Sequence, residues 1–146
     1  MAAYNKFNNF VDYLVGNVSG QSIKIADTWK VLLTNTAPVA TNTKYSDISA
    51  GEVANGNGYV TGGAASTVTA ANSSGTETVT AADVTFTASG GSIGPFRYAV
   101  FYDTTPTDKP LACWFDYGSS ITLNSGESFT VQPNSSSPTG TLFTLV

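Results

Sequence analysis

The feature that most constrains the fold is a series of short β-rich runs separated by Gly, Pro, Asn and Ser. After Gly20, apolar and β-branched residues alternate with a period of two or form runs of about four residues. No helical pattern lies between these runs, which disfavours the parallel strand–helix–strand units of α/β proteins. We therefore expect a mainly β protein: an antiparallel β-sandwich, jelly-roll-like, or a partly closed barrel.

The Gly, Pro, Asn and Ser residues between the runs set the ends of the expected strands. They lie at 22–26, 28–34, 58–61, 67–71, 76–80, 83–88, 96–103, 111–117, 120–123, 127–132 and 140–146. Within the second of these runs, Leu32 breaks the alternation of Trp29, Val31 and Leu33, which predicts burial on both sides of the strand. The polar runs on either side of 72–75 predict a hairpin with a four-residue loop, one face of which meets solvent or another chain.

The first residues follow a different pattern. Phe7, Phe10, Val11 and Leu14 stand at i, i+3, i+4 and i+7, which predicts an α-helix over 3–15. Gly16-Asn17 suits its C-terminal end. The helix would be either a lid packed on the sheet or a docking element for another subunit. We expect one domain over 1–146, with the helix at 3–15 and the sandwich at 22–146.

Composition narrows the function. The chain has 146 residues, of which 41% are hydrophobic and 12% aromatic, enough to bury a core. Only 11% are charged, with a net charge of −4, whereas about 25% is usual. Hydroxyl and amide side chains must therefore solvate most of the surface.

Several kinds of chemistry are excluded or disfavoured. Without histidine there is no histidine general base and no His-containing zinc set. The single cysteine, Cys113, has no partner for a disulfide within the chain, and we expect it to be a small buried apolar residue. The six basic residues are scattered along an acidic chain and form no basic cluster of the kind that binds nucleic acid. No run is long enough to cross a membrane as a helix, and Met1–Phe10 does not resemble a secretory signal, so we expect synthesis in a cytoplasm.

Two carboxylate pairs are candidate metal sites, and a third is a candidate catalytic pair. Asp47 with Glu52, or Asp103 with Asp108, could offer oxygens to Ca²⁺, but neither spacing fits an EF-hand loop. Asp103 and Asp116 could approach across neighbouring strands as a glycosidase pair, but nothing else in the sequence supports such an enzyme. We expect no catalytic residues, no metal and no cofactor.

Contact residues are the remaining candidates. Arg97, the only arginine, either covers apolar surface with its stem or pairs with Asp83, Asp103 or Asp116. Tyrosine is enriched at the centres of interfaces, and Phe7 lies on the predicted helix. The predicted interface residues are Tyr4, Phe7, Tyr13, Tyr45, Tyr59 and Arg97.

Four stretches and two shorter elements resemble a known family. They are Trp29–Pro38, Ala54–Gly63, Asp83–Asp103 and Trp114–Leu123, with Tyr4–Phe7 and Gly126–Val131. Together they resemble small proteins encoded among the virion structural genes of tailed bacteriophages. The resemblance implies a β-rich virion component, most like a head decoration (cement) protein, and supplies no catalytic residues.

From this resemblance we expect a protein on the capsid surface of the virion, made in the host cytoplasm. Its partners would be the major capsid protein and copies of itself, as a dimer or trimer, with no nucleic acid and no membrane. Clamping neighbouring capsomers through many repeated contacts would stabilise the shell. The candidate contact surfaces are the hairpin 67–80, the helix 3–15 and the segment 133–146.

The alternative is a tail, baseplate or fibre component. Such a protein could contact host surface glycans through aromatic residues, for which Trp29, Trp114 and Tyr117 are candidates. The strand positions of the two tryptophans favour a place in the core instead.

Overall fold

The computed structural model describes residues 2–135 and 139–146. Within them the chain is mainly antiparallel β with one small helix, which confirms the predicted fold class, and the strands do not close into a barrel. The elements are β1 (Ala3–Lys6), α1 (Phe10–Leu14), β2 (Trp29–Thr34), β3 (Ala64–Ser66), β4 (Val68–Ser73), β5 (Thr76–Ala82), β6 (Val84–Thr87), β7 (Ile93–Asp103), β8 (Leu111–Leu123), β9 (Ser128–Val131) and β10 (Thr139–Leu145), with 3-10 turns η1 (Tyr45–Asp47), η2 (Ser49–Gly51) and η3 (Pro133–Ser135).

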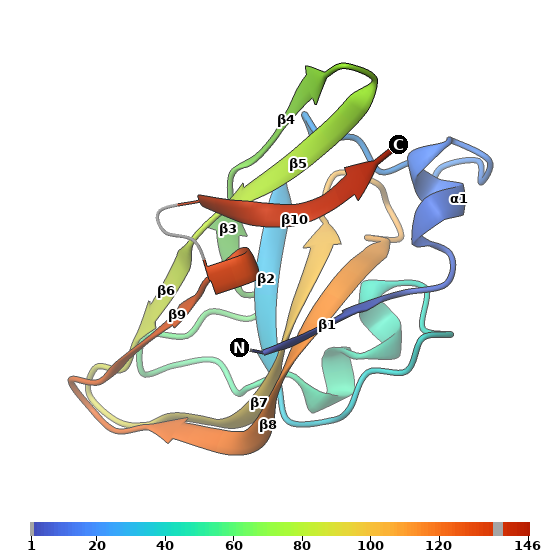
Figure 1. The fold of residues 1–146 in the computed structure, drawn as a ribbon. Helices are drawn as coiled ribbons and strands as arrows, with labels where there is room; N and C mark the ends of the chain where they lie inside the picture. Colours follow the sequence, from blue (N-terminus) through green and yellow to red (C-terminus); the bar gives the residue numbers. More distant parts are fainter. Residues whose placement is uncertain (1, 136–138) are drawn as a thin grey trace.

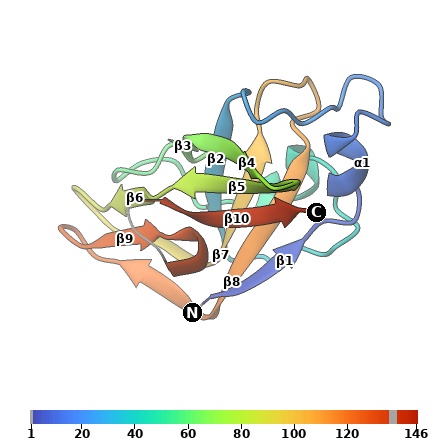
Figure 2. The same ribbon diagram turned by 45° about the horizontal axis from the view of Figure 1, so that its top comes forward.

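The strands form three sheets arranged as two layers (Figures 1 and 2). One layer is a five-stranded sheet in the order β1-β8-β7-β2-β3. The sheet β10-β5-β4 crosses over it, with the pair β6-β9 alongside. The main core lies between the layers, where Phe101 and Phe115 of the large sheet share one apolar cluster with Val79, Phe86 and Leu142. Alternating residues on the facing strands therefore make a sandwich-like core.

The large sheet is also covered on its other face. A second cluster there contains Leu32, Val100 and Trp114, against which Ala40 and Tyr45 of the long connection after β2 are packed. Leu32 is fully buried between neighbours that face the main core, so its predicted burial on the second side of the strand is confirmed.

The predicted helix over 3–15 is wrong in its extent. Residues 3–6 form β1, an edge strand paired with β8, and only Phe10–Leu14 are helical. Phe7 and Phe10 enter opposite cores, whereas Val11 is exposed, so the apolar residues do not form a single stripe. Backbone pairing with the free edge of β8 outweighs the weak helical periodicity of a short segment. Gly16, with φ of 71°, follows the helix end as expected.

Other boundaries also differ. The predicted strands at 22–26 and 58–61 are not strands, and the two predicted runs at 111–117 and 120–123 are one strand, β8. Gly118 lies inside β8 with φ of 84°, and its N–H donates to Asp116, so a local irregularity replaces the predicted break. The β4-β5 turn has two residues, Ser74 and Gly75, both with positive φ, rather than four.

Candidate functional site

An open groove lies where the two layers part. It has a volume of about 760 Å³, within the range of ligand sites. Its walls are the edge strands β1 and β10, with β8 and the β9–η3 segment between them. The lining residues are Ala2, Ala3, Tyr4, Phe115, Tyr117, Thr130, Gln132, Asn134, Thr141, Leu142, Phe143 and Thr144. None is charged, so the groove offers aromatic faces, hydroxyls and amides.

The groove is open because β1 pairs with only part of β8. β1 pairs with only four residues of β8, Cys113 to Asp116, whereas β8 continues to Leu123. Tyr4 pairs with Phe115 in the register, and their rings meet edge to face at 5.6 Å between centroids. Farther along β8, Tyr117 meets Phe129 at 4.9 Å. The short β1 thus leaves a sandwich edge whose floor is aromatic.

The groove stays neutral near pH 7. Burial raises the pKa of Tyr117 to about 12, and burial also raises the pKa of Tyr4. Both phenols therefore remain protonated and can donate hydrogen bonds. A neutral, partly aromatic partner fits this lining, because a charged group would lose its hydration without gaining an opposite charge.

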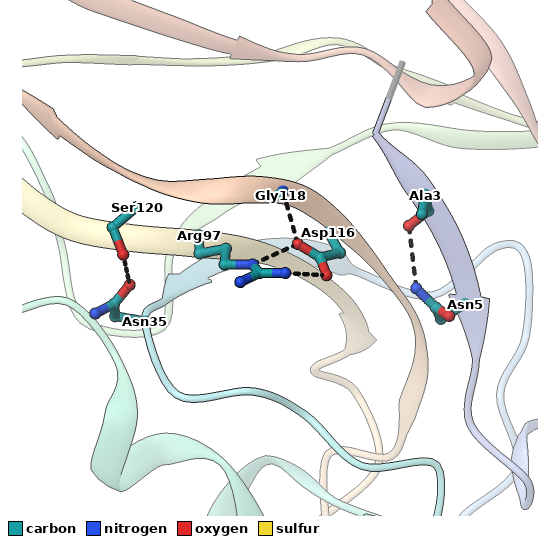
Figure 3. Close-up of polar contacts among 7 residues, drawn as sticks. All are labelled: Ala3, Asn5, Asn35, Arg97, Asp116, Gly118 and Ser120. Atoms are coloured by element: carbon teal, nitrogen blue, oxygen red, sulfur yellow. Dashed lines mark hydrogen bonds and ion pairs between the residues drawn. The ribbon is translucent and has the colours of Figure 1, made fainter.

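Arg97 forms an ion pair at the opposite face of the same sheet. Its Nε and a terminal nitrogen contact the two carboxylate oxygens of Asp116 at 2.7 and 2.9 Å (Figure 3). This pair raises the pKa of Arg97 and lowers that of Asp116. The guanidinium also lies over the Tyr98 ring, 5.2 Å from its centroid. Of the predicted acidic partners Asp116 is the one engaged, and the partly exposed pair ties β7 to β8.

The predicted interface residues divide into two groups. Phe7, Tyr13 and Tyr59 are at most 1% exposed, so their assignment to a surface is corrected: they are core residues. Tyr13 and Tyr59 belong to the main apolar cluster and Phe7 to the second, so the chain's own sheets bury these rings. Tyr4, at 41% exposure, lines the groove, and Tyr45 is half-buried. Tyr4, Tyr45 and Arg97 remain accessible.

The acidic candidates have structural partners instead of a shared site. Asp47 accepts hydrogen bonds from the N–H groups of Thr43 and Lys44, which caps η1. Glu52 accepts from the hydroxyls of Tyr45 and Tyr59 at 2.6 and 2.7 Å. Across the residues that the structure describes, no group of three or more Asp, Glu, Cys or His side chains could hold a metal ion.

The fold does not bring together Asp103 and Asp116, the candidate glycosidase pair. Asp116 lies opposite Tyr98, five residues before Asp103 on β7, which is about 16 Å along a strand. Asp103 is fully buried beside Asp27, and Asp108 accepts a hydrogen bond from Gln21. The spacing of about 5–9 Å needed for a carboxylate pair is therefore absent between Asp103 and Asp116.

Sequence reasoning named parts of the groove lining but did not predict the groove: Tyr4 and Tyr117 were candidates, and Asn134 and Thr141 to Thr144 lie in the predicted contact segment 133–146. Trp29 and Trp114 are buried, as their strand positions favoured, and of the three aromatic residues considered for glycans only Tyr117 lines the groove. Thr130 and Gln132 lie outside the predicted contact segments and had no recognisable motif. The available signal was the run of nineteen uncharged residues from 128 to 146. Residues 136–138 of the predicted contact segment 133–146 lie outside the described part.

Comparison with known proteins gives no match to any family model, curated protein or solved structure. The part of the chain that the structure describes has no helix long and apolar enough to cross a membrane.

Proposed function

We propose that this protein is a structural component of a bacteriophage virion, a capsid decoration protein that binds the major capsid protein and stabilises the head. The observation that carries the proposal is the uncharged groove between the strand edges β1 and β10. Uncharged hydroxyl, amide and aromatic groups are suited to burial against protein, because they pair or pack without the desolvation cost of charge. The sequence resemblance to tailed-phage structural proteins supports the choice of partner.

The contact face is the one that carries the groove. Repetition of one modest contact at every capsomer would give strong overall binding through multivalency. Such a role needs a stable scaffold and an accessible surface. The sandwich-like core supports the first requirement and the open groove supports the second.

A matched pair of variants tests this face. Thr130 lines the groove, and its hydroxyl hydrogen-bonds that of Thr85 on the neighbouring strand at 2.8 Å. T130K and T85K lose the same hydrogen bond and add the same charge, but Thr130 lines the groove and Thr85 does not. We expect T130K to weaken binding to shells lacking this protein at least tenfold in co-sedimentation, and T85K to bind like the wild type.

Localisation gives the decisive measurement. Cryo-electron microscopy of the intact virion should show this chain on the head, and adding the protein to bare shells should raise their melting temperature. Density for the chain only in the tail would overturn the decoration role.

A tail, baseplate or fibre role that includes glycan contact is the second candidate. The observation in its favour is that Tyr4 and Tyr117 lie in one groove with the amides of Gln132 and Asn134. Aromatic faces and uncharged hydrogen-bonding groups suit a neutral sugar. Saturable binding of the purified protein to host cells, lost in T130K but not in T85K, would support this role over the first.

A further inference from the structure

Two loops meet at one end of the large sheet: the segment 17–28 before β2, and the β7–β8 loop over 104–110 (Figure 2). Backbone groups hold them together. The N–H of Thr28 donates to Oγ1 of Thr105 at 3.0 Å, and the N–H of Thr104 donates to the carbonyl of Thr28 at 2.9 Å. Side chains from both loops therefore face one another across a fixed junction.

An open depression of about 310 Å³ lies at this junction. Its lining residues are Gly20, Ser22, Lys24, Asp27, Thr105 and Pro106. None of them lines the groove between β1 and β10. The depression is therefore separate from the proposed capsid-binding face.

Two carboxyl groups come together at this depression. Asp103 pairs in register with Trp29, two residues after Asp27, so the strand pairing brings the two acids close to each other. Asp27 lines the depression, and the fully buried Asp103 lies within hydrogen-bonding reach of it. Oδ1 of Asp103 accepts from the N–H of Thr105, but Oδ2 has no hydrogen-bond partner among the described residues. Buried carboxylates are normally paired with a cation or bound to a metal, and this oxygen has neither partner in the protein.

No basic side chain of the described residues neutralises the two acids. Within 2–135 and 139–146 the one ion pair is that of Arg97 with Asp116. Lys24 lines the depression, but its side chain is exposed and forms no ion pair with either acid. Asp108, on the same β7–β8 loop, accepts a hydrogen bond from Gln21 and does not line the depression. A cation from solvent can therefore reach the pair through the depression.

We propose that Asp27 and Asp103 bind a calcium ion at this depression. Calcium takes carboxylate, hydroxyl and water oxygens in flexible geometries, whereas magnesium requires a nearly ideal octahedron. Asp27 and Oδ2 of Asp103 supply the charged ligands, and the lining adds the hydroxyls of Ser22 and Thr105. The sequence pairs Asp103 with Asp108 as a candidate calcium site, and the fold puts Asp27 in that place. Two carboxylates beside an open depression predict a dissociation constant of about 1 mM.

Thermal unfolding of charge-matched variants tests the site. In chelator-treated buffer, about 10 mM CaCl₂ should raise the melting temperature of the wild type by about 3–4 °C relative to NaCl of equal ionic strength. D27N and D103N each lose one ligand and should shift by less than about 1 °C. D108N should shift like the wild type, because it removes the same charge from the same loop region and leaves both ligands in place.

Terbium luminescence gives a measurement that does not depend on stability. The Trp29 ring lies beside the site, because Trp29 pairs with Asp103 and its indole N–H donates to the carbonyl of Lys24 at 3.0 Å. Excitation of tryptophan should give sensitised Tb³⁺ emission from the wild type and D108N, and excess CaCl₂ should remove it. D27N and D103N should reduce the emission at least tenfold.

Three results would overturn the calcium site: no sensitised emission, no calcium-dependent shift of the wild-type melting temperature, or equal responses of D27N and D108N. The two acids would then be a carboxyl pair that shares a proton. Shell binding is measured separately with T130K and T85K, so the failure of the calcium site leaves the proposed function standing.

Discussion

At the scale of single residues, the acidic side chains have structural roles that depend on their surroundings. Asp103 is fully buried, with one carboxylate oxygen accepting from Thr105 and the other without a hydrogen-bond partner among the described residues. Burial, followed by the nearby Asp27, raises the pKa of Asp103 to about 6. The folded chain thus binds this proton more tightly than the unfolded chain does.

The pH dependence of stability follows from that shift. Because the pKa of Asp103 is higher in the folded state, its contribution to the free energy of unfolding is greatest below pH ~4 and is lost as pH rises through about 6. At pH 7.5 the free energy of unfolding of D103N should be about 2 kcal/mol higher than that of the wild type, and this difference should disappear near pH 4. Urea unfolding at several pH values measures this effect, with D12N at an exposed aspartate as the control. A pH-independent difference would contradict the assignment.

Glu52 is the residue that fixes the long connection after β2. Besides the two tyrosine hydroxyls, it accepts from the N–H of Gly62 at 2.6 Å. The Tyr59 hydroxyl in turn accepts from the N–H of Leu33, so the carboxylate is joined to the central sheet. Charge-assisted bonds of this kind are among the stronger hydrogen bonds.

Removal of this carboxylate should be costly. E52A leaves the buried Tyr59 hydroxyl without its acceptor and should lower the free energy of unfolding by about 3 kcal/mol. D47A, which removes the exposed cap of η1, should cost only about 1 kcal/mol. Chemical unfolding of both variants provides the measurement, and equal losses would show that the Glu52 network is not the stronger anchor.

At the scale of elements, the N-terminal segment shows how an unfilled strand edge determines local structure. β1 pairs with β8, and Phe7 then packs on Trp114 at 4.5 Å while Phe10 packs on Phe143 at 5.0 Å. The segment therefore contributes to both cores. Deleting residues 2–15 would remove these aromatic groups together with the edge strand, so loss of capsid binding by such a truncation would report misfolding.

Two point variants distinguish the observed structure of the N-terminal segment from the predicted helix over 3–15. Phe7 is fully buried and Val11 is 44% exposed, although a 3–15 helix would place both on one apolar stripe. F7A should lower the free energy of unfolding by about 3–5 kcal/mol, and V11A should change it by less than about 0.5 kcal/mol. Thermal or urea denaturation of both proteins checks this, and comparable losses would favour the continuous helix instead.

At the scale of the whole molecule, the low charge of the chain includes one groove with an entirely uncharged lining. The groove between β1 and β10 has no charged lining residue, and the apolar residues at the C-terminal end of β10 are exposed beside it. The polar hairpin β4-β5 lies on the same sheet, but its exposed side chains are small and hydrophilic. The distribution favours β10 over the hairpin as the main contact surface.

The sequence by itself determined the antiparallel β class, the β2 run and the double-sided burial of Leu32, because alternation and Gly/Pro/Asn punctuation are local consequences of strand geometry. It also identified Asp116 as one possible partner of Arg97. Only the tertiary structure decided that residues 3–6 form a strand, that Phe7, Tyr13 and Tyr59 are core residues, and that the groove forms from segments over a hundred residues apart. Those outcomes depend on which strand edges remain free after the sheets assemble, and no local pattern encodes that.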